Sequence, residues 1–301
     1  MVKHGGLAGG GGWTAAAAGP WLLSLLIFFA FPLAGLVVLS LTDRAGHFSL
    51  ANYVSIADLS SGQFDVLLRT VRIGITTVIL SLLISVPVGY YLAKIVRSPR
   101  IESLVLLLVA ATFLAGPLVR TVSWRGILGV HGLINESLMQ LGVIRMPILS
   151  LLYGELAITL ALTYNVFVFL IFTTYLSMKV LDDRIIAAAR DLGASPASAF
   201  FRVVLPLAAP GVITGAVLVF VPTLSAVLVP EILGGTSSRL MATAIRDQFF
   251  HAQNWPLGAA LTVLLIVAGA LTIGAIALVL SLFFKFCSHI GLVTGVAKRG
   301  K

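Results

Sequence analysis

Long apolar runs separated by short polar stretches dominate the chain. Six runs come close to the ~20 residues that a helix needs to cross a bilayer, and they cover residues 21–41, 72–94, 103–123, 152–176, 211–231 and 259–284. The first run is too long for the ~7–15-residue core of a cleaved signal, so we interpret it as a retained span. The pattern predicts an all-α membrane protein with six transmembrane helices.

The predicted domain organisation follows from these runs. A transmembrane domain covers residues 21–286, between an N-terminal tail of residues 1–20 and a C-terminal tail of residues 287–301. An even number of spans places both tails on one side of the membrane. If that side is the cytoplasm, all six lysines and six of the arginines fall in inner segments, whereas eight arginines fall in outer ones. This bias predicts cytoplasmic termini, by the positive-inside rule.

Composition supports a chain that is solvated mainly by lipid. The mean hydropathy is +1.07 and only 10% of the 301 residues are charged, against about 25% in soluble domains. The net charge of +9 would suit nucleic-acid binding in a soluble protein. Here the basic residues stand mainly between the apolar runs, where they act as topology determinants, so we expect membrane lipid and no nucleic acid as partners.

Catalytic and metal-binding patterns have no support in the sequence. Cys287 is the single cysteine, and the five histidines have no ligand spacing. An ATP-binding P-loop needs a lysine followed by serine or threonine, and no lysine of this chain has that neighbour. We therefore expect no catalytic residue, no metal site and no cofactor bound by this chain, which is interpreted as a transport subunit and not an enzyme.

The polar stretch between the fourth and fifth runs reads as a helix, a glycine turn and a second helix. Asp182 or Asp183 can cap the first helix through its carboxylate. Gly193 permits the left-handed conformation that ends a helix. Ser195 then serves as a new cap, with Pro196 at the first helical position. We name residues 182–206 the 182–206 loop and expect it to face a partner protein.

This loop resembles the EAA loop of ABC-importer permeases, which has a Glu-Ala-Ala triplet, a glycine and a later Leu-Pro pair. The residues that match the motif are Ala188, Ala189, Gly193, Leu205 and Pro206. Ala187 replaces the glutamate of the motif and Val203 replaces an isoleucine. The resemblance implies that the loop forms a cytoplasmic coupling helix that docks on an ATPase subunit, which binds ATP and Mg²⁺. Arg190 and Asp191 are then expected to supply the polar part of that contact.

Two further stretches narrow the resemblance to one subfamily. GLINESLMQLGVIRMP at residues 132–147 and PEILGGTSSRLMATAIRDQFFHAQNWPLGAA at residues 230–260 are similar to segments of the B-type permease subunit of spermidine/putrescine importers. This implies the type I ABC-importer permease fold and a place in the cell inner membrane. The implied partners are a homologous second permease, two copies of an ATPase and an extracytoplasmic binding protein. A polyamine is the expected cargo, and opines, amino-acid derivatives, phosphonates and ferric ion stay open.

Four residues are candidates for the solute path. Carboxylates near a membrane pathway are costly unless they serve a purpose, which singles out Glu231 and Glu155, both expected near the outer mouth. The alternative for either residue is a salt bridge to an outer arginine. The aromatic faces of Tyr164 and Trp255 can attract ammonium groups, although packing or interfacial anchoring is the favoured explanation for both. Asn165 is not among the four: it could line the path, but a hydrogen bond to a neighbouring helix is the favoured explanation.

A transporter that acts alone is the alternative from another class. Secondary transporters are often built from inverted halves, and the six runs show no evident inverted repeat. The coupling-type loop also argues for an ATP-driven complex. A requirement for a partner ATPase would separate the two classes.

Overall fold

The computed structural model describes residues 20–21, 23–24, 26–235 and 238–297. Within these residues the chain is helical, and its only β-type pairing is an isolated bridge between Thr42 and Phe48. Most of the predicted N-terminal tail lies outside the described residues. The chain divides into two compact units, one formed by residues up to Ser61 and 245–264, the other by residues 62–244 and those from Leu265 onwards.

The first unit contains the start of the chain and a later segment. Its helices before residue 62 are η1 (Leu26–Ala30), α2 (Phe31–Ser40), α3 (Ala51–Ala57) and η2 (Leu59–Ser61). Two helices cross between the units along the chain, namely α14 (Met241–Phe250) and α15 (Trp255–Ala297). Ser40 is buried and its hydroxyl is hydrogen-bonded to that of Tyr53 at 2.7 Å, which ties α2 to α3.

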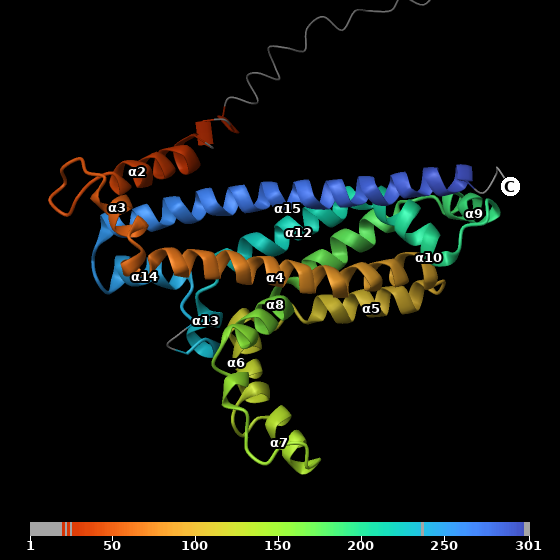
Figure 1. The fold of residues 1–301 in the computed structure, drawn as a ribbon, viewed down its shortest axis with the longest axis horizontal. Coiled ribbons are helices and arrows are strands. Elements are labelled where there is room, and N and C mark those ends of the chain that lie inside the picture. Colours follow the sequence, from red (N-terminus) through yellow and green to blue (C-terminus); the bar gives the residue numbers. More distant parts are fainter. Residues whose placement is uncertain (1–19, 22, 25, 236–237, 298–301) are drawn as a thin grey trace, which may run out of the picture. The chain divides into compact units, whose positions relative to one another are not determined.

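The second unit contains the remaining helices (Figure 1). In chain order they are α4 (Gln63–Tyr90), η3 (Tyr91–Ile95), α5 (Pro99–Ala111), α6 (Pro117–Leu128), α7 (Leu133–Gln140), η4 (Leu149–Leu151), α8 (Glu155–Lys179), α9 (Asp183–Asp191), α10 (Pro196–Ala199), η5 (Phe200–Val204), α11 (Leu205–Leu207), α12 (Ala209–Leu224) and α13 (Leu228–Leu233).

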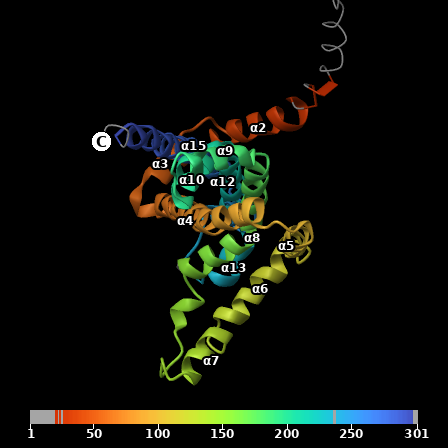
Figure 2. The same ribbon diagram turned by 90° about the vertical axis from the view of Figure 1, so that its right-hand side faces the viewer.

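Helices α4, α8 and α12 pack together as the centre of the second unit, as Figures 1 and 2 show. Their contacts include the buried side chains of Val78, Leu170 and Phe220. Helix α8 is more enclosed than α4, since 56% of the residues in its apolar stretch are buried against 33% in that of α4. A helix that is apolar on all sides is expected in such a central position.

The structure contains three helical stretches that are long and apolar enough to cross a membrane, within the described residues. They are Gln63–Ile95, Glu155–Lys179 and Trp255–Cys287. The bent pair Pro196–Leu207 and Ala209–Leu224, with an angle of 70°, makes a fourth if it counts as one span. The first predicted span appears as a shorter apolar helix over Leu26–Ser40. The number of six spans therefore stays a prediction.

Two predicted spans are broken. The prediction of one continuous helix over 103–123 is wrong, because α5 ends at Ala111 and α6 begins at Pro117. Proline has no N–H and stands readily at the start of a helix, as Pro117 does here. Similarly, the run 211–231 divides into α12 and α13 around Ser225. The last helix is longer than predicted, since α15 continues to Ala297 through most of the expected C-terminal tail.

Candidate functional site

The 182–206 loop folds as the sequence predicts. Asp182 is the cap of α9, and its carboxylate accepts a hydrogen bond from the Arg184 N–H at 2.9 Å. Gly193 follows α9 with a φ of +87°, in the left-handed region that favours glycine. The Ser195 hydroxyl accepts from the Ser198 N–H at 3.2 Å. These local bonds hold two helices at a fixed turn.

One face of α9 presents apolar side chains outwards. Ile185 is 44% exposed and Leu192 is 78% exposed, and Ala188 between them is exposed too. These residues follow one another at three- and four-residue steps, so they share a helix face. Ile186 points the other way and packs on the core of the unit. The loop therefore has an inner face that packs on the unit and an outer apolar face that no described residue covers.

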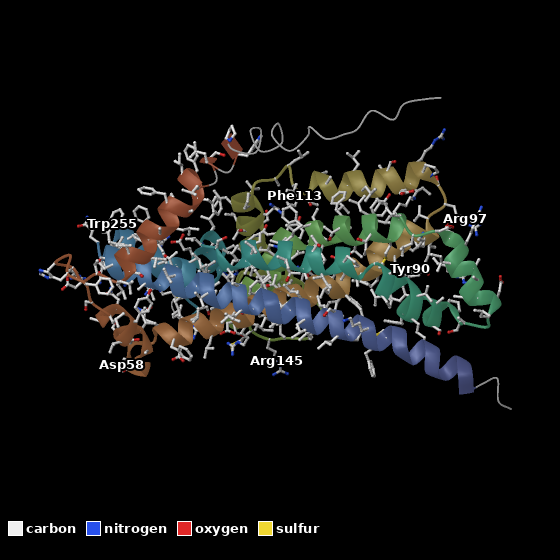
Figure 3. All side chains as sticks on the ribbon, turned by 90° about the horizontal axis from the view of Figure 1, so that it is seen from above. Asp58, Tyr90, Arg97, Phe113, Arg145 and Trp255 are labelled. Carbon is white, nitrogen blue, oxygen red and sulfur yellow. The ribbon has the colours of Figure 1, made fainter. Side chains whose placement is uncertain are left out.

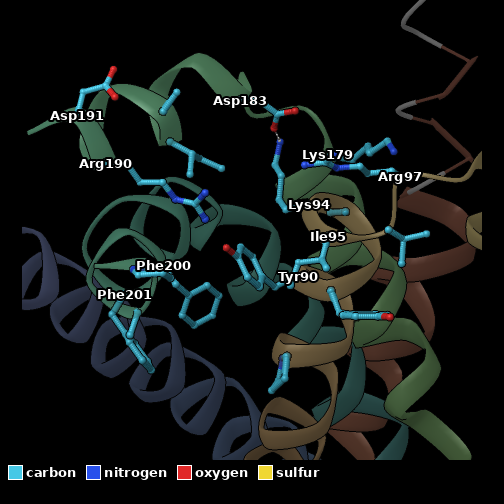
Figure 4. A pocket seen from close by; sticks show the side chains of 18 residues that line it. Tyr90, Lys94, Ile95, Arg97, Lys179, Asp183, Arg190, Asp191, Phe200 and Phe201 are labelled. Carbon is cyan, nitrogen blue, oxygen red and sulfur yellow. Dashed lines mark hydrogen bonds and ion pairs between the residues drawn. The ribbon is translucent and has the colours of Figure 1, made fainter. Parts of the chain in front are cut away.

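A cavity of about 1090 Å³ opens beside the loop, between α9, α10 and the end of α4 with η3 (Figure 4). Tyr90 and Arg97 lie at this end of the second unit in Figure 3. The charged residues that line it are Lys94, Arg97, Lys179, Asp183, Arg190 and Asp191. The ring of Phe200 packs edge-on against Tyr90 with a centroid distance of 4.6 Å. The cavity thus combines an aromatic wall with several charges of both signs.

Two lysines at this cavity tie the loop and α8 to neighbouring helices. The Lys94 ammonium, 5% exposed, pairs with Asp183 at 2.6 Å and donates to the Leu181 carbonyl. Lys179 pairs with Glu102 at 2.6 Å, and Tyr175 also donates to that carboxyl. Lys179 and then Tyr175 hold the pKa of Glu102 below its usual value. Lys94 consequently connects η3 directly to the first residue of α9.

We expect Lys94→Met to loosen the 182–206 loop. The substitution keeps the length of the buried side chain and removes both of its polar contacts. Asp183 is 84% exposed, so solvent screens the pair and its loss costs about 1 kcal/mol. Amide hydrogen exchange across α9 should rise roughly fivefold, which corresponds to that energy. Arg97→Met is the matched control, since Arg97 lines the same cavity, is exposed and has no interaction with another described residue. Equal exchange rates in both variants would contradict the prediction that Lys94 holds α9 in place.

The motif residues of the loop occupy different environments. Ala187, Arg190 and Asp191 line the cavity and are exposed. Ala189 is half-buried, whereas Leu205 is buried and Pro206 stands at the start of α11. The chain bends by 70° between Leu207 and Ala209. The outward residues are therefore those of α9, and the Leu-Pro pair lies just before the bend.

The structure places the candidate path residues in different surroundings. Glu155, at the start of α8, pairs with Arg69 at 3.2 Å and Arg72 at 2.5 Å. This is the salt-bridge alternative that the sequence left open, now with two arginines of α4. Glu231 is exposed on α13, and α13 packs on α8 in one apolar cluster through Ile158, Val229 and Leu233. The two carboxylates thus stand on adjacent helices.

The aromatic candidates take part in ring packing. Tyr164 is half-buried, with its ring 5.9 Å from those of Trp124 and Phe167. Trp255 is 57% exposed and its ring packs edge-on against Phe249 at 5.4 Å. Trp255 belongs to the first unit and the other three candidates to the second. Packing accounts for Tyr164, while the exposed ring of Trp255 keeps a free face.

The sequence analysis missed a buried arginine. Arg120 on α6 is only 5% exposed, although the sequence groups it with the outer arginines. Its guanidinium donates to the backbone carbonyl of Asn165 at 3.1 Å and lies 5.0 Å from the ring centre of Phe113. Pro117, three residues earlier, was the available signal, since it marks the break at which α6 begins.

Comparison with known proteins defines the class. Residues 74–287 match the family described as binding-protein-dependent transport system inner membrane component. The chain belongs to this family and is an inner-membrane permease subunit of an ABC importer.

Among curated relatives, it is 38% identical over 200 residues to the spermidine/putrescine transport system permease protein PotB of Haemophilus influenzae, over 66% of this chain and 68% of that protein. The PotB of Escherichia coli is 32% identical over 220 residues, 73% of this chain and 78% of that protein. The predicted resemblance to this subfamily is confirmed.

A solved structure confirms the fold. A bacterial alginate ABC transporter, in complex with an alginate-bound periplasmic protein, contains a chain that superposes with a TM-score of 0.63 at 17% identity. The match covers 92% of this chain and 93% of that one. At this identity the comparison supports the importer permease fold only.

Proposed function

We propose that this chain is one permease of a heteromeric ATP-driven importer of polyamines, with spermidine or putrescine as cargo. The observation that carries the cargo class is the similarity to two PotB proteins over most of their lengths. The other members of the complex are a homologous second permease, two copies of an ATPase that bind ATP and Mg²⁺, and an extracytoplasmic binding protein. The name of the family is consistent with the last of these.

The outer face of α9 is the proposed docking surface for the ATPase. Ile185 and Leu192 offer exposed apolar area, and burial of such area drives association. The motif glutamate is absent at Ala187, so Arg190 and Asp191, both exposed beside it, supply the charged contacts. The loop then lies in the cytoplasm, as do both termini. This orientation agrees with the distribution of lysines in the sequence.

Transport by the reconstituted complex tests the proposal. Proteoliposomes with both permeases, the ATPase and the binding protein should accumulate radiolabelled spermidine or putrescine, and only when ATP and the binding protein are present. Uptake of neither polyamine would discard the cargo while the importer class stands. Uptake without the ATPase would instead favour a transporter that acts alone.

Glu231 and Glu155 should differ in this assay. Glu155 is half-buried and pairs with two arginines of α4, whereas Glu231, which also has an interaction within the chain, is exposed on α13. A carboxylate on the path lowers the cost of moving an ammonium group out of water. We therefore expect Glu231→Gln to raise the KM for spermidine uptake about tenfold, a change of ~1.4 kcal/mol. Glu155→Gln, the matched control, should change KM less than twofold. An equal effect of both substitutions would contradict the assignment of Glu231.

A further inference from the structure

A second, smaller cavity of about 460 Å³ lies where the helices are broken. Its lining includes Phe113 and Pro117 at the break between α5 and α6, and Ser225 and Leu228 at the break between α12 and α13. The middle of α8 forms its floor through Asn165. Phe113, which is labelled in Figure 3, projects from the first of these breaks. The two interruptions of the predicted spans therefore meet at one cavity.

Two buried polar atoms at this cavity lack partners. Arg120 is 5% exposed and Asn165 is 9% exposed. The Nε atom of Arg120 and the Oδ1 atom of Asn165 have no hydrogen-bond partner among the described residues. The single bond from Arg120 to the Asn165 carbonyl uses one of five guanidinium donors. No described carboxylate pairs with Arg120, so the described residues do not neutralise its charge.

Such a group cannot face lipid. Asn165 lies ten residues into α8, about 15 Å from its first residue at ~1.5 Å per residue, and thus near the middle of a membrane span. Ionised side chains at this depth pair with other groups or line a cavity. Non-helical backbone at membrane depth is likewise tolerated only where it is buried in protein or lines a water-filled cavity. Nevertheless the rim is open, with Phe113 39% and Leu228 44% exposed. The described residues therefore leave the cavity open at its rim.

We propose that a carboxylate side chain of the second permease enters this cavity and pairs with Arg120. The inference rests on the proposed function, since it requires that second subunit. A carboxylate accepts a forked pair of bonds from a guanidinium, which is the partner that Arg120 lacks. The proposed cargo is itself a cation and cannot neutralise an arginine. The Asn165 amide oxygen stays available beside the pair for an N–H of the same subunit.

Photo-cross-linking tests which molecule covers the cavity. The complex is purified with Cys287→Ser in this chain, and a benzophenone maleimide is attached to Phe113→Cys or Leu228→Cys at the rim. Leu107→Cys, 65% exposed on α5, is the matched control. Irradiation should link the rim positions to the second permease several-fold more than the control. Adducts mainly with lipid would overturn the proposal. So would a cross-link that excess spermidine abolishes, because the cavity would then hold solute.

Substitution of the arginine tests the charge itself. Arg120→Gln leaves the partner carboxylate without its counter-charge, so the amount of second permease that co-purifies should fall about tenfold or more. Arg125→Gln is the matched control on the same helix, since Arg125 is exposed and should keep the complex. Arg120→Glu, combined with a lysine in place of the carboxylate of the second permease nearest to the mapped cross-link, should restore the complex. Equal retention in both Gln variants would overturn the pairing. If the unaltered chain retains no second permease, the proposed function fails instead.

Discussion

Gly193→Val is expected to abolish most ATP-driven uptake while the protein still inserts into the membrane. Gly193 has a φ of +87°, and the left-handed region costs an ordinary residue ~1–2 kcal/mol and a β-branched one more. A Cβ atom added at this position meets nothing within 4 Å, so the expected penalty comes from the backbone conformation. The turn would open and α9 would change its angle to α10. ATP hydrolysis by the complex should continue while uptake falls at least tenfold.

The matched control is Gly193→Asn. Asparagine tolerates the left-handed conformation better than other non-glycine residues, and it adds more polar atoms than valine does. If the backbone conformation is what matters, Asn should keep uptake within about twofold of the unaltered chain. If Asn and Val impair uptake equally, side-chain bulk at the ATPase contact is responsible, and the role that we assign to the backbone conformation of Gly193 is wrong.

The turn was predictable because its chemistry is local. Asp182, Gly193 and Ser195 act on groups within a few residues along the chain, so their order in the sequence is enough to assign them. Pro117 was also visible in the sequence, yet the apolar run around it was stronger as a pattern than one proline. The break at residues 112–116 was therefore hidden within a predicted span.

The surroundings of the charged side chains could not be predicted in the same way. Glu155 pairs with Arg72, which lies 83 residues away in the sequence, and the residues next to either one do not predict that pair. Arg120 looks like the other outer arginines until α6 is placed against α8. Burial is a property of packing between helices, and apolar runs describe only which segments are helical. The class of protein and the fold of the 182–206 loop could therefore be predicted from the sequence, whereas the burial of Arg120 became visible only in the structure.

Gly215→Leu is expected to have the largest effect on the fold itself. Gly211 and Gly215 are four residues apart on α12 and face α8, a spacing that permits close approach of membrane helices. A Cβ atom at Gly215 would overlap the side chains of Thr173 and Leu170 and would lie 3.3 Å from the Leu170 Cα. The backbone of α8 cannot yield as a side chain can, since α8 is the centre of the unit.

Gly215→Leu should lower the stability of the fold by about 3 kcal/mol, the upper end of the range for overpacking. Gly215→Ala should lower the stability less than Gly215→Leu does. Thermal unfolding in detergent, followed by the loss of monodisperse protein, measures it. Gly274→Leu on α15 is the matched control, because a Cβ there meets nothing within 4 Å. Both substitutions add the same apolar volume to a membrane helix. A lower melting temperature for Gly215→Leu alone would show that α12 is held on α8 by close contact, and equal temperatures would mean that the two helices are free to separate.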